Sequence, residues 1–157
     1  MSAVDQKLAE LGIELPTPAA PVANYVPFVR AGNLVILSGQ LCFGPDGKLA
    51  EAHKGKLGAE VSPETGQAAA RLCAVNILAL LKSAVEGDWD RVVRCVRLGG
   101  FINAVPTFAG LAPVMNGASD LIVAVLGERG RHARTTIGVA ELPLDAAVEV
   151  EALFEVR

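Results

Sequence analysis

The feature that most constrains this fold is a long amphipathic segment near the middle of the chain. From Ala69 to Ala84, apolar residues recur at the i, i+3, i+4, i+7 spacing of an α-helix with one buried face. Ser62 is a suitable N-cap, and Pro63 falls at the first helical position, where its missing N–H costs nothing. The sequence therefore predicts a long helix that begins after Ser62 and ends near Glu86-Gly87.

Five further segments have the composition or alternation of β-strands: Val26–Arg30, Leu34–Ser38, Arg91–Asn103, Arg134–Leu142 and Ala147–Val156. The first two flank an Ala31-Gly32-Asn33 turn and predict a hairpin. The third is dominated by Val, Leu, Ile and Phe and predicts a strand bent at Gly99-Gly100, although its evenly spaced arginines also fit a helix. The last alternates strictly, with apolar residues on one face and glutamates on the other.

Two more helices complete the predicted order. Ser2 and Asp5 have the spacing of a helix start, and Gly12 ends that short N-terminal helix. A Pro-rich connector, with Pro16, Pro18, Pro21 and Pro27, should be extended. Residues 106–127 contain the other helix. The order strand-strand-helix-strand-helix-strand-strand predicts an α+β fold with helices on one side of a sheet, in which residues 1–23 precede a main domain of residues 24–157.

Composition narrows the class of protein. Hydrophobic residues make up 52% of the 157 residues and aromatic residues only 4%, and the mean hydropathy is +0.41. This excludes an intrinsically disordered chain. No window approaches the roughly 18–20 unbroken apolar residues that cross a bilayer, so no membrane partner is expected. So much apolar material in a small domain indicates either a face buried against another subunit or an unusually apolar monomer core.

Charge and cysteine content also bear on partners and compartment. The net charge of −3 disfavours a nucleic-acid partner, because polyanions are bound through basic patches. Cys42, Cys73 and Cys95 are widely spaced and predict no disulfide framework, and no basic-then-apolar leader opens the chain, so we expect a cytoplasmic protein. The two histidines, His53 and His132, have no metal-site spacing, so no metal is expected. Cys73 and Cys95 fall on apolar faces and are interpreted as core residues.

Cations concentrate just before one predicted strand, at Arg129, Arg131, His132 and Arg134. We interpret Arg129 and Arg131 as part of a solvated loop. Arg134 differs because it enters the strand, where a rigid base suits its planar guanidinium to bidentate capture of a carboxylate. Glu149, on the polar face of the last strand, is either a surface residue or a carboxylate that orients water.

Two motifs resemble those of a known family, the Rid (reactive intermediate deaminase) or YjgF proteins. Residues 33–40, Asn-Leu-Val-Ile-Leu-Ser-Gly-Gln, resemble the family's Ser-Gly-Gln hairpin. Residues 133–136, Ala-Arg-Thr-Thr, followed by 139–143 and by 148–152, Val-Glu-Val-Glu-Ala, resemble its C-terminal signature. The resemblance covers residues 24–156. It implies a chorismate-mutase-like α+β domain, with a mixed sheet and two main helices on one face, assembled as a homotrimer with clefts between subunits.

The resemblance also implies an activity and a set of site residues. Active members hydrolyse enamine and imine products of pyridoxal-phosphate dehydratases to 2-oxo acids and ammonia, without cofactor or metal. By position, Arg134 would bind the substrate carboxylate and Glu149 would position the attacking water. The residues expected to line the cleft are Tyr25, Ser38 (through its hydroxyl), Gly39, Asn116 and Thr136. Thr136 stands where deaminase members commonly have Cys, and the stretch from Phe108 to Arg134 is longer than in compact members.

Two other functions stay open at this point. One is a ligand-binding or regulatory trimer of the same family that holds a small carboxylate, such as a 2-oxo acid, without turnover. RNA cleavage is a label that the family sometimes carries, but the negative net charge and the lack of an acid–base histidine pair disfavour it.

Overall fold

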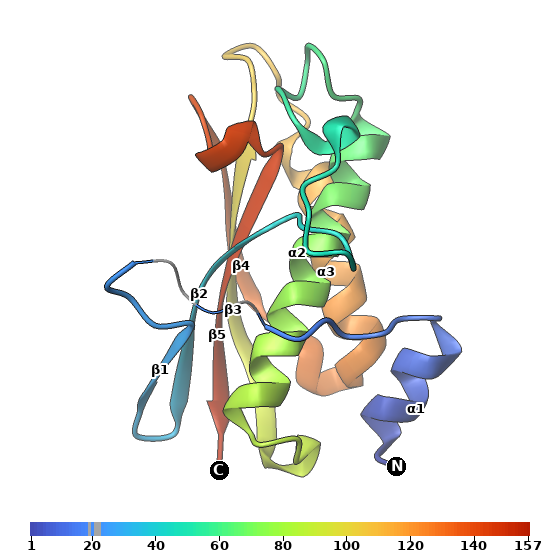
Figure 1. Ribbon diagram of the computed structural model, residues 1–157, viewed down its shortest axis with the longest axis vertical. Helices are drawn as coiled ribbons and strands as arrows, with labels where there is room; N and C mark the ends of the chain where they lie inside the picture. The colour runs from blue at the N-terminus through green and yellow to red at the C-terminus, as the bar shows by residue number, and fades with distance from the viewer. Residues whose placement is uncertain (19, 21–22) are drawn as a thin grey trace.

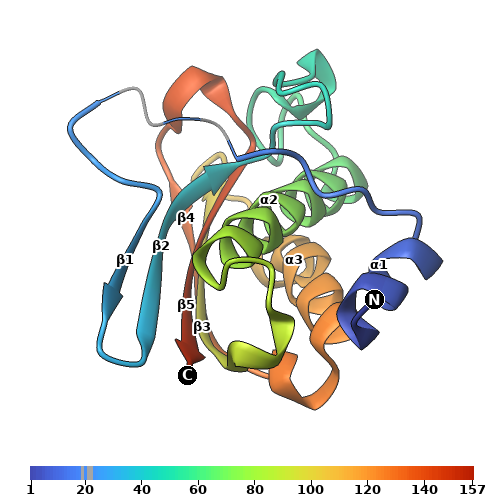
Figure 2. The same cartoon turned by 60° about the horizontal axis from the view of Figure 1, so that its bottom comes forward.

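One layer of the fold is a five-stranded sheet in the order β1-β2-β5-β3-β4. The computed structural model describes residues 1–18, 20 and 23–157. The strands are β1 (Phe28–Ala31), β2 (Leu34–Leu41), β3 (Val92–Asn103), β4 (Ala133–Val139) and β5 (Val148–Val156). Only the β3–β4 pair is parallel, so the sheet is mixed. The second layer contains α2 (Pro63–Ala84) and α3 (Leu111–Leu126), both on one face of the sheet, and α1 (Ala3–Glu10) lies beyond them (Figures 1 and 2). The predicted α+β order is confirmed.

Helix α2 forms as its sequence predicts. The Ser62 hydroxyl accepts a hydrogen bond from the Thr65 amide at 3.1 Å, and Pro63 occupies the first turn. Beyond Ala84, the chain leaves the helix through Glu86 and Gly87, whose φ angles are 56° and 81°. Only at such left-handed positions does glycine remove strain, so Gly87 makes a suitable stop. Most of the apolar face of α2 is buried between the sheet and α3.

The pairing of β3 with β5 is regular at Gly99 and Gly100, where the sequence predicted a bend. The register with β5 runs unbroken through Gly99 and Gly100, and the shifts lie earlier, between Val92 and Arg97. The glycines instead make room for side chains, because a Cβ at Gly99 would lie 2.7 Å from Glu151 Oε1 and one at Gly100 would lie 2.5 Å from Met115 Sδ. They mark close side-chain approach, which strand glycines also do.

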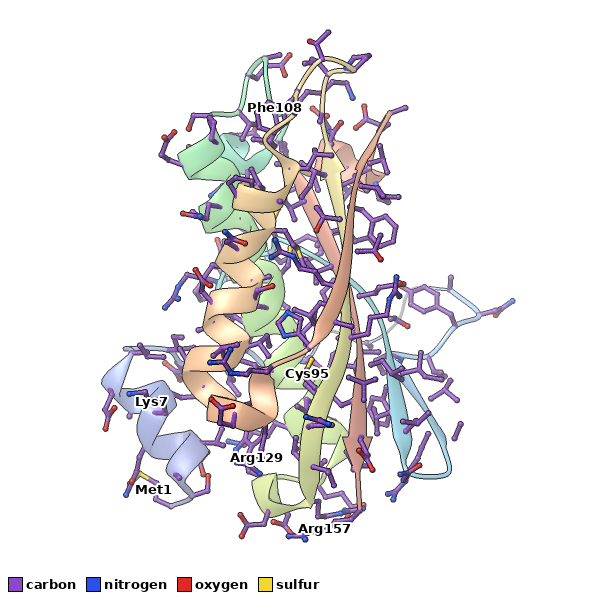
Figure 3. The ribbon with its side chains drawn as sticks, turned by 180° about the vertical axis from the view of Figure 1, so that it is seen from behind. Met1, Lys7, Cys95, Phe108, Arg129 and Arg157 are labelled. Carbon is purple, nitrogen blue, oxygen red and sulfur yellow. The ribbon has the colours of Figure 1, made fainter. Side chains whose placement is uncertain are left out.

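Alternation in β5 divides the sheet into two faces. The even-numbered residues of β5 are buried under the helices, as predicted: Val148, Val150, Ala152, Phe154 and Val156. Glu149 and its alternate neighbours in β5 are only partly buried, and by the alternation of the strand they stand on the other face. No helix of the described residues covers that face (Figure 3). Large apolar side chains are exposed beside them, including Val29 and Ile36, which pair across β1 and β2. We call this side of the sheet the open face.

The N-terminal helix is tied to the main body by Asp5. Its carboxylate caps α1 through Ser2 and accepts a hydrogen bond of 3.1 Å from Trp89 Nε1. The hydrogen bonds of Ser2 lower the pKa of Asp5 to about 2. The predicted helix start is therefore confirmed. Of the connector prolines, Pro21 lies outside the described residues.

Helix α3 with the turn after it, Leu111–Gly130, is long and apolar enough to cross a membrane by length and composition alone. Its apolar residues pack against α2 and the sheet instead, with Met115, Leu121 and Ile122 fully buried. This internal packing accounts for the hydropathy of the segment.

Candidate functional site

Arg134 is held against α3 by three neutral acceptors. Its Nη1 donates to Asn116 Oδ1 at 2.9 Å and to Ser119 Oγ at 3.0 Å, and its Nη2 donates to the Ala112 carbonyl at 3.2 Å. The acceptors stand at i, i+4 and i+7 of one helix, so they form a single stripe along α3. Strand β4 brings Arg134 to this stripe because alternate residues of the strand face the helices. The predicted neighbours Arg134 and Asn116 therefore lie together.

The guanidinium keeps donors and charge to spare. Three of its five N–H groups have the acceptors just named, and the Nε–H and one Nη2–H have no partner among the described residues. No carboxylate of the described chain lies within salt-bridge distance of Arg134, although seven ion pairs of Lys or Arg form elsewhere among the described residues. A fixed, uncompensated guanidinium with free donors is suited to bind an anion.

Thr136 lies two residues further along β4 on the same face. Its Oγ1 is buried and has no hydrogen-bond partner in the part of the chain that the structure describes. A buried hydroxyl without a partner is uncommon and costs free energy. Arg134, Asn116 and Thr136 thus form one group, which we call the arginine cluster.

The other cations before β4 have separate roles. Arg131 is exposed and pairs with Glu128 at 3.0 Å, as expected for a solvated loop. For Arg129 the expectation of a solvated loop is wrong, because its Nη1 donates to the carbonyls of Val92 at 2.9 Å and Trp89 at 3.3 Å. Figure 3 labels Arg129 beside β3, below the end of α3. Its guanidinium satisfies backbone carbonyls where β3 begins, so it is a structural residue.

A second group of predicted site residues, which includes Glu149, lines a cavity of about 320 Å³. We call it the glutamate cavity. Tyr25, Ser38, Gly39 and Glu149 contribute to it, with apolar walls from Leu41, Phe43, Leu80, Pro143 and Leu144. The Ser38 hydroxyl is already used, because it donates to the Val26 carbonyl at 2.7 Å. It therefore fixes the segment beside Tyr25.

The carboxylate of Glu149 lies half buried and accepts no hydrogen bond from any described residue. It packs on Gly39, where a Cβ would lie only 2.2 Å from Glu149 Oε1. Partial burial, and after it the negative charge of Glu151, raises the pKa of Glu149. A carboxylate of raised basicity beside a cavity is a suitable proton acceptor.

The side chains of Arg134 and Glu149 lie on opposite faces of the sheet. Arg134 pairs with Leu98 of β3, which is buried under the helices, whereas Glu149 pairs with Phe101 of the same strand. Positions three apart along a strand point to opposite sides. One copy of the chain therefore cannot bring the Arg134 and Glu149 side chains to one small substrate.

The cysteines lie in the core, as predicted for Cys73 and Cys95. Burial raises the pKa of both thiols, that of Cys95 to about 12. A hydrogen bond with the Cys73 thiol lowers the pKa of Cys42 to about 7, but Cys42 is fully buried as well. None of the three is accessible as a nucleophile in this fold.

Sequence reasoning missed two side chains that adjoin the arginine cluster, Ser119 and His132. Ser119 donates to or accepts from His132 Nε2 at 2.9 Å, and it also contacts Arg134. Ser119 follows Asn116 at the i+3 position, which puts both on one helix face, and this spacing was the available signal. In the sequence His132 stands out only as one of the cations before the strand.

Comparison with known proteins agrees with this fold. Residues 5–156 match a family model described as "YjgF/chorismate_mutase-like, putative endoribonuclease". The chain is 48% identical over 155 residues to "Protein TCP17" of Trypanosoma cruzi, covering 98% of this chain and 94% of that protein. It is 28% identical over 145 residues to a 2-iminobutanoate/2-iminopropanoate deaminase of Dermatophagoides farinae, covering 92% and 95%.

A solved structure extends the likeness over the whole chain. Atu1372 of Agrobacterium tumefaciens, a protein of unknown function, has 46% sequence identity and a TM-score of 0.91, covering 99% of this chain and 93% of that one. The match over residues 5–156, together with the two motifs and the fold, confirms the predicted relationship. The chain belongs to the YjgF/chorismate mutase-like family.

Proposed function

We propose that this protein is a cofactor-free hydrolase that converts 2-imino acids, and the enamines in equilibrium with them, to 2-oxo acids and ammonia. The observation that carries the proposal is the Arg134 guanidinium, fixed by three neutral acceptors with two N–H groups free and no carboxylate partner in the described chain. Such a group binds a substrate carboxylate and fixes the position of the adjacent imine carbon. The deaminase relative from Dermatophagoides farinae supports this reaction class.

Glu149 supplies the second half of the chemistry. Its raised pKa makes the ionised carboxylate a better base toward water. Water adds to the imine carbon, its oxygen forms the new C–O bond, and the C=N electron pair moves to nitrogen. Glu149 takes a proton from water and passes it to the nitrogen, which gives a carbinolamine with one –OH and one –NH2 group. In a second transfer through Glu149 the hydroxyl proton moves to the nitrogen, the oxygen forms the C=O bond of the 2-oxo acid, and the C–N bond breaks to release ammonia. Because free imines already hydrolyse in water, orientation and modest electrostatic help suffice.

The complete site forms between copies of the chain, with Arg134 of one copy facing the glutamate cavity of the next. The opposite orientation of the two side chains supports this, since one copy holds only half of each site. The exposed apolar side chains of the open face, Val29, Ile36 and Ile137, support a homotrimer in which copies cover these faces. The substrate would lie against the apolar walls of the cavity, beside Tyr25 and Gly39.

The test is the hydrolysis of 2-iminopropanoate or 2-iminobutanoate, generated in situ by a dehydratase acting on serine or threonine. We expect the protein to accelerate ammonia release and Arg134→Ala to return it to the uncatalysed rate. Arg131→Ala is the matched control, because Arg131 is exposed and, among the described residues, its side chain pairs only with Glu128. It should keep the wild-type rate.

An uncatalysed rate for the wild-type protein would contradict the hydrolase. If a 2-oxo acid nevertheless raised its unfolding temperature, and Arg134→Ala removed that effect, a non-catalytic carboxylate-binding protein would be the better interpretation. The family description includes endoribonuclease. The wild-type protein and Arg134→Ala should therefore also be incubated with RNA, and we expect neither protein to cleave it.

A further inference from the structure

A continuous hydrogen-bond chain runs from the turn before β4 to Arg134. His132 Nδ1 lies 2.6 Å from the Gly130 carbonyl, and His132 Nε2 lies 2.9 Å from Ser119 Oγ. Ser119 Oγ lies 3.0 Å from Arg134 Nη1. All three side chains are partly buried between α3 and the edge of the sheet. The chain therefore links backbone, ring, hydroxyl and guanidinium in series.

Chemistry sets the direction of each bond in this chain. A carbonyl can only accept, so His132 Nδ1 carries a hydrogen and donates it to Gly130. In the neutral ring, Nε2 then accepts, so the Ser119 hydroxyl donates to it. This leaves the lone pairs of Ser119 Oγ to accept from Arg134 Nη1. His132 thus fixes the hydroxyl rotor in the one orientation that suits the guanidinium.

Ser119 is not behaving as an ordinary helix serine. A serine within a helix commonly bonds a carbonyl of its own preceding turn, but the hydrogen bonds of the Ser119 side chain go to His132 and Arg134, outside the helix. With Asn116 on the second Nη1 hydrogen and the Ala112 carbonyl on Nη2, the Nε–H and one Nη2–H remain for a ligand. The direction of these free donors depends on the orientation of the guanidinium plane.

We propose that Ser119 and His132 are positioning residues that hold the Arg134 guanidinium in its carboxylate-binding orientation. The inference rests on the proposed function, in that Arg134 is taken to bind the substrate carboxylate. Without Ser119 or its ring partner, the long arginine side chain must lose more rotamer freedom when the ligand binds. Carboxylate affinity then falls by about tenfold, the amount expected for ordering one long side chain.

The experiment measures binding of 2-oxobutanoate by calorimetry to the wild-type protein and to four variants. Ser119→Ala and His132→Phe remove the contact, and both should raise Kd by about tenfold. His132→Gln keeps an acceptor near the place of Nε2, and His132→Asn keeps a donor near the place of Nδ1. We therefore expect His132→Gln to bind almost as tightly as the wild type and His132→Asn to bind as weakly as His132→Phe.

A purely structural role for His132 in the turn would reverse that order, because the contact with Gly130 would then matter most. In the deamination assay the weakened variants should raise KM with little change in kcat, whereas general damage would lower kcat as well. Equal Kd values for all five proteins would overturn the positioning role and leave the proposed function standing. If the wild-type protein bound no carboxylate while folded, the proposed function itself would fail, and the positioning role with it.

Discussion

The arginine cluster and the glutamate cavity differ in how each satisfies its charged group. Arg134 has three hydrogen-bond acceptors from its own chain, all neutral, so its position is fixed and its charge is not cancelled. Glu149 has no hydrogen-bond donor in the described chain, lies half buried, and has another carboxylate, Glu151, as its charged neighbour. The Arg134 guanidinium is therefore positioned to bind an anion, and the raised pKa of Glu149 makes its carboxylate a better base.

This difference is informative because a structural ion pair would show the opposite. In a structural ion pair, each charge stabilises the other, so the pKa of the carboxyl group falls and the pKa of the base rises. Here the sheet separates the two charges, and the carboxylate is shifted toward its neutral form. Each region is incomplete alone and complementary to the other, which is why we propose that neighbouring copies join them.

The largest expected effect comes from separating the two halves by mutation and then recombining them. Arg134→Ala and Glu149→Gln should each reduce imine hydrolysis to the uncatalysed rate. When the two inactive variants are unfolded together and refolded as mixed trimers, about a quarter of the sites should contain an intact Arg134 and an intact Glu149. Activity should therefore return to about a quarter of the wild-type value.

Each variant refolded alone is the control, and so is the mixture before subunit exchange. No recovery in exchanged trimers would mean that the site does not join two copies. A monomer by light scattering would break the comparison at an earlier step, since the two side chains could then never meet.

The sequence predicted the elements of the fold well because each depends on local patterns. The Ser62 cap, the stripe of α2 and the alternation of β5 are readable residue by residue. The motifs also pointed to Arg134 and Glu149. That these two lie on opposite faces could not be read in the same way, because it follows from which residues of β4 and β5 pair with which residues of β3.

Packing between distant elements explains the other differences. Ser119 and His132 are 13 positions apart and meet only because α3 packs beside the start of β4. The sequence predicts a loop cation at Arg129, but its guanidinium donates to the carbonyl of Val92 at the start of β3, a residue 37 positions earlier in the chain. Gly99 and Gly100 looked like a bend, but the side chains of Glu151 and Met115 occupy the space that they leave.

A smaller effect is expected from adding one methyl group beneath Glu149. In Gly39→Ala the new Cβ would lie 2.2 Å from Glu149 Oε1, so the carboxylate must move away while the backbone stays. A displacement of about 1 Å can cost about a hundredfold in rate, and we expect a loss of kcat/KM up to that size with the unfolding temperature nearly unchanged. Binding of a 2-oxo acid through Arg134 should weaken much less than the rate falls.

Gly138→Ala is the matched control, because a Cβ there meets nothing closer than 3.6 Å and the position lies in the same sheet. It should keep most of the activity. If Gly39→Ala were as active as this control, the position of the Glu149 carboxylate would not matter to the reaction, and the glutamate cavity would lose its catalytic role.

The smallest expected effect is a shift in pH dependence that belongs to one region only. Because the pKa of Glu149 is raised, its ionised, basic form is lost as pH falls through that raised value, so kcat/KM should decline on the acid side at a higher pH than for an ordinary glutamate. Glu151→Gln removes the second cause of the shift and leaves the first, burial. The midpoint of the decline should therefore move to lower pH without reaching the ordinary value.

Glu155→Gln is the control for this shift. Glu155 stands on the same face of β5 but accepts a hydrogen bond from Asn33 at 3.1 Å, and its substitution should leave the midpoint in place. Carboxylate binding by Arg134 should show no matching shift in either variant, because its partners are neutral, and a shared shift would contradict the separation of the two regions.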